Sequence, residues 1–155
     1  MTKLEKKAQP AVQKLLRKDE DQLYKELGMR QKVIAKDIYL IGSFDFDVPY
    51  DVTVMGPMDE LRKFGEQLFK RYQVEAHKIF CPKEEGDKED IDNLKKAIGI
   101  DDAAVAAVIT AAIVASGVGI APALAAVVAV LIVKRFLRPT YEETCKAWAK
   151  YLPPV

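Results

Sequence analysis

The chain has 155 residues, with 24 Lys and Arg against 23 Asp and Glu, and a formal net charge of +1. This balance argues against nucleic acid as a partner, because proteins that bind nucleic acid usually carry a basic excess. Half of the residues are hydrophobic, which excludes a disordered chain, and two cysteines are too few for a disulfide-dense scaffold.

The length, the N-terminus and the cysteines together indicate one cytoplasmic domain. Residues 1–155 have the size of a single domain with a real core. No apolar stretch follows the charged residues 1–7, so we expect no secretory signal peptide. Cys81 and Cys145 are 64 positions apart without the CxxC spacing of a zinc site, and we expect two free thiols in a reducing compartment.

Residues 1–30 are predicted to form two short helices or one kinked helix. Apolar residues recur there at helical spacing, and Asp19 with Gln22 can form a capping box at a helix start. Because glycine readily adopts the left-handed conformation that ends helices, Gly28 predicts an end near Leu27.

Residues 33–81 are predicted to hold a small strand and helix region. β-branched and aromatic residues between Gly and Pro indicate strands at 38–41 and 50–55, which could pair as a hairpin. A helix is expected over residues 57–72, because acidic residues open it and basic residues close it, as the helix dipole favours. Residues 74–81 are expected to form a third strand.

Residues 87–152 are predicted to be helical. Asp87 can cap a helix that runs through Ile98. After a very short connection, either Asp101 or Asp102 can cap the next helix.

The segment Ala103–Val133 contains 31 consecutive residues without a charge. Its helix-breaking residues cluster at 116–122, where a Ser-Gly-Val-Gly sequence ends one helix and a proline begins another. We therefore predict a helical hairpin over residues 102–137, with arms of about 102–116 and 122–137. Alanines recur every four positions on both arms, and such ridges of small residues let helices approach closely.

This apolar hairpin must be covered by other helices or by lipid. Each arm offers only about 12 to 14 apolar residues, whereas about 20 are needed to cross a bilayer. As a single span, the segment would export about 100 charged residues under the positive-inside rule. The amphipathic helices on both sides can cover the hairpin, so we predict a buried centre, with membrane insertion of residues 103–133 as the alternative.

The C-terminal region predicts a further amphipathic helix. Thr140 and Glu143 can form a capping box directly after a proline. Tyr141, Cys145 and Trp148 follow at i, i+4 and i+7, which places them on one helix face. Residues 134–150 carry five basic and two acidic residues, a cationic rim that could pair with anionic lipid or with an acidic face of a second copy.

One acidic stretch could hold a cation. Asp45, Asp47 and Asp51 lie on a segment expected to be extended, where alternate carboxylates face the same way and could share a hard metal ion. A solvated acidic edge that protects a strand from aggregation explains the same residues. We therefore assign no metal site.

Two other motifs fall short of a catalytic or cofactor site. On a strand, His77 and Cys81 would face the same way but lie roughly 13 Å apart, too far for a catalytic dyad unless the segment is helical. The Gly-Val-Gly sequence at 117–119 lacks the third small residue and the preceding strand of a dinucleotide fingerprint. We assign no catalytic residue and no cofactor.

The sequence thus predicts a mostly α-helical domain with a small β element (α+β), built as a helical bundle around a central apolar hairpin. It favours a non-enzymatic cytoplasmic interaction or assembly module that binds a protein partner or itself. The alternative is a conditional membrane-inserting effector, pore-forming or membrane-damaging, that uses the 103–133 hairpin. An enzyme that uses Asp45, Asp47 and Asp51 with a divalent metal is a third hypothesis.

Overall fold

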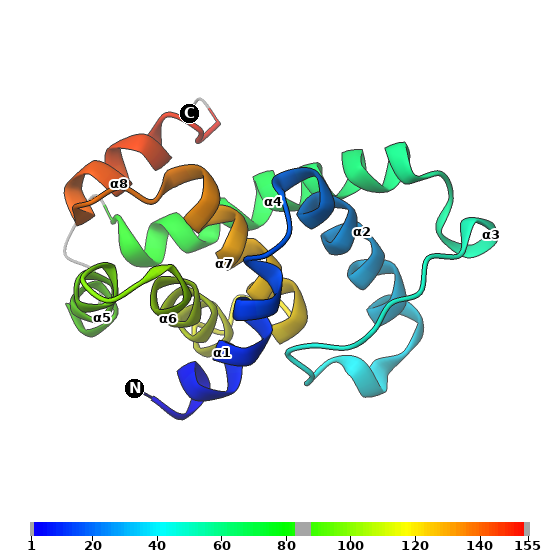
Figure 1. Cartoon of the computed structure of the whole chain (residues 1–155), viewed down its shortest axis with the longest axis horizontal. Helices are drawn as coiled ribbons and strands as arrows, with labels where there is room; N and C mark the ends of the chain where they lie inside the picture. The colour runs from blue at the N-terminus through cyan, green and yellow to red at the C-terminus, as the bar shows by residue number, and fades with distance from the viewer. Residues whose placement is uncertain (1, 83–87, 154–155) are drawn as a thin grey trace.

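The computed structural model describes residues 2–82 and 88–153, and these residues form a bundle of α-helices without a β-strand (Figure 1). The predicted helical bundle is confirmed, and the predicted β element is wrong. The predicted cap residue Asp87 lies outside the described residues. In chain order the elements are α1 (Lys3–Leu15), α2 (Glu20–Lys36), the 3-10 helix η1 (Ile38–Leu40), α3 (Val52–Met55), α4 (Met58–Phe80), α5 (Lys88–Ile98), α6 (Asp102–Ala115), α7 (Pro122–Phe136) and α8 (Tyr141–Ala149).

Aspartates start helical turns at two places where strands were predicted. The Asp37 carboxylate accepts a hydrogen bond from the backbone N–H two residues later, at 3.0 Å, and η1 follows. Asp51 does the same at 2.9 Å at the start of α3. Because such local bonds compete with strand pairing, Ile38–Leu40 and Val52–Met55 form short helical turns in place of the predicted hairpin.

The third predicted strand, residues 74–81, is instead the last part of α4 and its C-terminal cap. The buried residues of α4 continue at helical spacing to its end, with Gln73, Ala76 and Phe80 three and four positions apart. A short apolar run cannot be assigned to a strand or a helix by periodicity alone. The longer helical spacing of the whole segment decides between them.

Gly28 does not end a helix but lies inside α2. A Cβ atom on Gly28 would lie 2.6 Å from the carbonyl oxygen of Leu61 in α4. A Cβ atom on Gly65 of α4 would lie 1.8 Å from the carbonyl oxygen of Tyr24 in α2. The two glycines therefore mark the place where the backbones of α2 and α4 touch, and Gly28 serves packing rather than termination.

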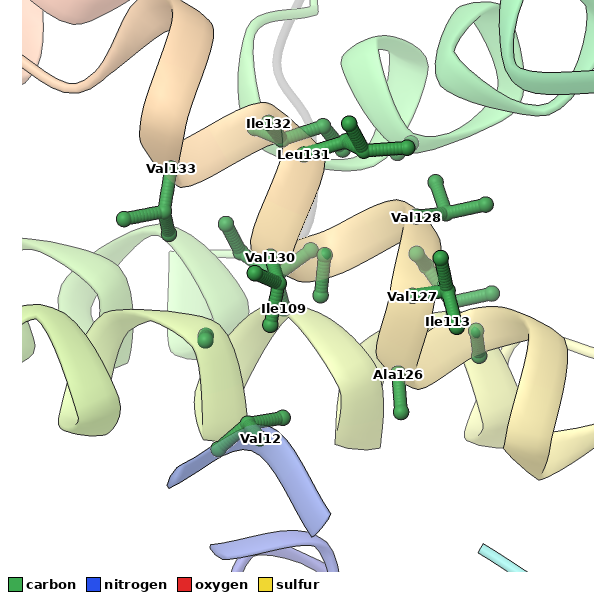
Figure 2. Close-up of a cluster of buried hydrophobic side chains, with 14 of the residues drawn as sticks. Val12, Ile109, Ile113, Ala126, Val127, Val128, Val130, Leu131, Ile132 and Val133 are labelled. Atoms are coloured by element: carbon green, nitrogen blue, oxygen red, sulfur yellow. The ribbon is translucent and has the colours of Figure 1, made fainter. Parts of the chain in front are cut away.

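The predicted apolar hairpin is present and lies at the centre of the bundle. Residues 104–113 of α6 and 123–133 of α7 are all buried. Figure 2 shows Ile109 and Ile113 gathered between the two helices, with Val12 of α1 approaching the same cluster. The hairpin is thus the core around which the other helices pack.

The hairpin turn follows the sequence signals closely. Gly117 and Gly119 have φ angles of 76° and 82°, in the left-handed region that favours glycine, and Pro122 begins α7. Of the two aspartates that could cap α6, the structure uses Asp101, whose carboxylate accepts the N–H of Ala104 at 2.8 Å.

Five helices cover the hairpin. Helix α1 packs against α6 and α7, α5 against α6, α2 against α7, α4 against both arms, and α8 against α7. Within residues 2–82 and 88–153, none of the helices combines the length and the apolar character needed to cross a membrane.

A disulfide ties α8 to the end of α4. The hydroxyl of Thr140 accepts the N–H of Glu143 at 3.1 Å, so the predicted start of this helix is confirmed. On the predicted helix face, Cys145 is bonded to Cys81, the residue that follows α4. The prediction of two free thiols is wrong, because the fold brings the two Cα atoms to 5.8 Å, a separation that a disulfide spans.

Candidate interaction site

The segment that joins α2 to α4, residues 37–57, carries most of the exposed large hydrophobic side chains of the described residues. We call it the α2–α4 connection. It contains η1 and α3, and its remaining residues form neither helix nor strand. Figure 1 shows it along the end of the molecule that lies far from α5 and α8.

A buried arginine anchors this connection to the helices. Arg30 of α2 is only 2% exposed. Its guanidinium donates from Nε to Glu26 at 2.9 Å, from Nη1 to the carbonyl oxygen of Ala123 at 2.9 Å, and from Nη2 to Asp45 at 2.8 Å. One side chain therefore joins α2, the first turn of α7 and the connection.

Two lysines complete the ion-pair network. Lys14 of α1 donates to the other carboxylate oxygen of Asp45 at 2.9 Å, and Lys18 lies 3.4 Å from the Glu26 carboxylate. Burial raises the pKa of Asp45, but the hydrogen bond from Lys14 and the charge of Arg30 outweigh it and hold the pKa below its ordinary value. Through its bond to Asp45, the pKa of Lys14 is raised. Both groups of this pair therefore stay charged at neutral pH.

A pocket of about 460 Å³ lies beside this network. Its apolar lining comes from Leu15 of α1 and from Phe46, Val48 and Pro49 of the connection. Its basic and acidic side chains are equal in number, namely Lys14, Lys18, Arg30, Glu26, Asp45 and Asp47. Because these charges balance one another, the pocket carries no net charge for an ionic ligand.

Large hydrophobic side chains are exposed along the α2–α4 connection. The exposed fractions are 72% for Ile38, 91% for Tyr39, 50% for Ile41, 39% for Tyr50 and 55% for Val52. Outside this segment, the described part of the chain exposes only two other large hydrophobic residues, Ile100 and Val118. Exposed apolar residues gathered in one segment are typical of interaction sites.

The structure does not bring together the three aspartates that were considered as cation ligands. Asp45 is engaged by Arg30 and Lys14, and Asp51 accepts hydrogen bonds from the N–H and the hydroxyl of Thr53. Across the described ranges, no group of three or more His, Cys, Asp or Glu side chains is arranged to hold a metal ion.

The other sequence motifs have structural roles. The sulfur of Cys81 is bonded to Cys145, and the ring of His77 lies edge-on to Trp148 with 5.1 Å between ring centroids. The Gly-Val-Gly sequence at 117–119 is the turn between α6 and α7. Neither motif forms a nucleophile with its base or a phosphate-binding loop.

Sequence reasoning missed Arg30, although a signal for it exists. Arg30 continues the buried face of α2 that Leu23, Leu27 and Ile34 define at helical spacing. A charged residue on an otherwise apolar face must find partners inside the protein. Its partner Asp45 is 15 positions away across an irregular segment, so the sequence does not identify the pair.

Comparisons of this chain with protein-family models, with curated proteins and with solved structures find no match.

Proposed function

We propose that this protein is a non-enzymatic interaction module that presents its α2–α4 connection to a protein partner. The observation that carries the proposal is the exposure of Ile38, Tyr39, Ile41, Tyr50 and Val52 on one segment. Exposing large apolar side chains to water is unfavourable, and binding a partner would relieve it. The Arg30 network supports the proposal, because a segment held in place loses less conformational entropy when it binds.

The charge of the α2–α4 connection, together with the first turn of α4, indicates the chemistry of this partner. Residues 37–60 contain six acidic residues and no Lys, Arg or His. Of these, Asp37, Asp47, Asp51, Asp59 and Glu60 are exposed. A partner segment that carries both basic and apolar side chains complements this surface, because opposite charges favour encounter and apolar contacts supply affinity.

A designed pair of peptides tests this proposal. One is an amphipathic helix of Leu and Lys, and the other has the same pattern with Glu in place of Lys. The Lys peptide should bind, and the double substitution Tyr39→Ser with Ile41→Ser should weaken its binding at least about tenfold. The control Ile100→Ser removes an exposed apolar residue outside the segment, whose exposed fraction of 71% lies between those of Tyr39 and Ile41, and should leave peptide binding unchanged.

Two results would contradict the proposal: equal binding of both peptides, or equal binding of the Lys peptide by wild type and by the double variant Tyr39→Ser with Ile41→Ser. Sedimentation of the protein alone should show a monomer. A dimer that the Tyr39 and Ile41 substitutions abolish would show that a second copy occupies the surface instead.

The hairpin supports a second candidate function, conditional insertion into a membrane. Its tip at residues 115–119 already lies at the surface, with Val118 40% exposed, while both arms are apolar on all sides. Dye leakage from anionic vesicles at pH 5 and pH 7 tests this candidate. Leakage should be reduced by Val118→Asp and not by the control Ile100→Asp, and no leakage by the wild-type protein would contradict it.

A further inference from the structure

Helix α8 is attached to the rest of the molecule at two covalent points. It continues from α7 through residues 137–140, and Cys145 in its middle is bonded to Cys81 at the end of α4. Both cysteines are only partly buried. Figure 1 shows α8 beside the C-terminal part of α4.

The non-covalent attachment of α8 is small. Only Thr144 and Trp148 of its nine residues are buried. The indole N–H of Trp148 donates to the side-chain oxygen of Gln73 at 2.7 Å. The hydroxyl of Tyr141 donates to the carbonyl oxygen of Phe80. A helix of nine residues is too short to be stable without such contacts.

Aromatic side chains lie beneath α8 and the residues that follow it. The ring of Trp148 stacks on Phe136 of α7 at 5.7 Å between centroids. Tyr151 lies 5.8 Å from Phe69 of α4 and 5.4 Å from Phe136, again between centroids. Lifting α8 and Tyr151 away would remove the rings that pack on Phe69 and Phe136 and would expose Trp148.

We propose that the Cys81–Cys145 disulfide is a redox-controlled clasp that keeps α8 closed over this aromatic surface. A dithiol reductant opens it by two exchange steps. One reductant thiolate attacks a cysteine sulfur and breaks the S–S bond, and the second thiolate then displaces the cysteine from the mixed disulfide. The two electrons come from the reductant, which becomes a cyclic disulfide, and both cysteines end as protonated thiols.

The position of the bond explains why opening would be local. Cys145 lies between Tyr141 and Trp148, so while the bond is intact α8 cannot pivot about residues 137–140. After reduction, α8 is held by the buried side chains of Thr144 and Trp148 and by the hydrogen bond of Tyr141, without a covalent link to α4. Elements with few buried contacts open at lower free energy than the core of a protein. In this fold the core is the α6–α7 hairpin.

The native protein tests the proposal with its own probe, because Trp148 is the only tryptophan. Dithiothreitol in native buffer should shift the tryptophan emission to longer wavelength and increase acrylamide quenching at least about twofold. Hydrogen exchange of peptides from α8 should accelerate at least about tenfold, while peptides from α7 stay protected. The double variant Cys81→Ser with Cys145→Ser should behave like the reduced protein, and adding the reductant should not change its emission or its hydrogen exchange.

A matched control separates local opening from general weakening. The variant Gly65→Ala strains the contact of α2 with α4 without touching α8, so its oxidised form should keep α8 closed. Unchanged emission and unchanged α8 exchange after reduction would overturn the proposal. Equal loss of protection in α7 and α8 would overturn it as well, because the whole bundle would then have opened as one unit.

Discussion

Two glycines determine how closely α2 and α4 pack. At Gly65 the nearest atom to an added Cβ is a backbone oxygen, which cannot move aside without shifting a helix. The close crossing of these helices therefore requires glycine at positions 28 and 65. Sequence reasoning assigned Gly28 to a helix end, because glycine has two uses, a turn and a close approach, and a sequence does not distinguish them.

Replacing Gly65 by alanine should destabilise the fold by about 1 to 3 kcal/mol, the usual cost of forcing an extra methyl into a packed interior. The matched control is Gly42→Ala, where an added Cβ meets nothing within 4 Å. Urea denaturation followed by circular dichroism measures both variants. Equal stability of the two would show that the helices can separate at little cost.

Replacing Arg30 by methionine should lower the free energy of unfolding by about 3 kcal/mol, because it removes an ion-pair partner from the buried carboxylate of Glu26 and the partly buried carboxylate of Asp45. Replacing Lys14 by methionine should have a small effect, since its side chain is 63% exposed. Thermal unfolding at pH 7 compares the two variants. A larger fall in Tm for Lys14→Met than for Arg30→Met would contradict the role given to Arg30.

The Asp45 pairing should also be visible in the pH dependence of stability. Because the folded state lowers the pKa of Asp45, the pairing contributes stability above the ordinary value of 3.8 and loses it as pH falls through the lowered pKa. The stability difference between wild type and Asp45→Asn should therefore be constant from about pH 5 to 7 and shrink below about pH 4. A difference that disappears near pH 6 would exclude this carboxylate as its cause.

At the scale of elements, local signals explain which predictions succeeded. The α6–α7 hairpin was predicted from its cap, its Gly-Val-Gly turn and Pro122, all of which act within a few residues. The strand predictions were wrong because the β-branched and aromatic residues at 38–41 and 50–55 were given more weight than Asp37 and Asp51, which directly precede η1 and α3. Those aspartates start helical turns by bonding to the backbone.

The cap of α6 offers a test with neighbouring residues. Asp101→Ala should destabilise the protein by about 1 kcal/mol, because it removes the acceptor for the N–H of Ala104. Asp102→Ala should cost less than half as much, since Asp102 interacts only with the helix dipole. Chemical denaturation of both variants measures the difference, and a reversed order would contradict the assigned cap.

At the scale of the whole molecule, the disulfide and the exposure of apolar side chains on one segment could not be predicted from the sequence. Cys81 and Cys145 are 64 positions apart, and only the packing of α8 on α4 shows that they meet. The net charge of +1 conceals residues 37–60, which hold six acids and no base. The exposed apolar side chains of this segment resembled strand residues, so the candidate interaction surface could not be predicted.

Reducing the disulfide should lower the stability of the whole fold as well. A cross-link between residues 64 positions apart lowers the conformational entropy of the unfolded chain, which raises its free energy by roughly 4 kcal/mol. For a protein of this size, this corresponds to a fall in Tm of about 8 to 16 °C. Scanning calorimetry with and without a dithiol measures it. The variant Cys81→Ser with Cys145→Ser should match the reduced protein, and an unchanged Tm would contradict the expected contribution.

The guanidinium of Arg30 also limits how a partner can bind. A ligand that pulled Asp45 away would leave a buried N–H donor without its acceptor, a cost that few contacts at a small surface could offset. Binding should therefore proceed as rigid docking, with the backbone near Asp45 nearly unchanged and an association rate set by collision and orientation. A partner that remodels the segment before it binds would associate more slowly and would have to supply its own acceptor for Arg30.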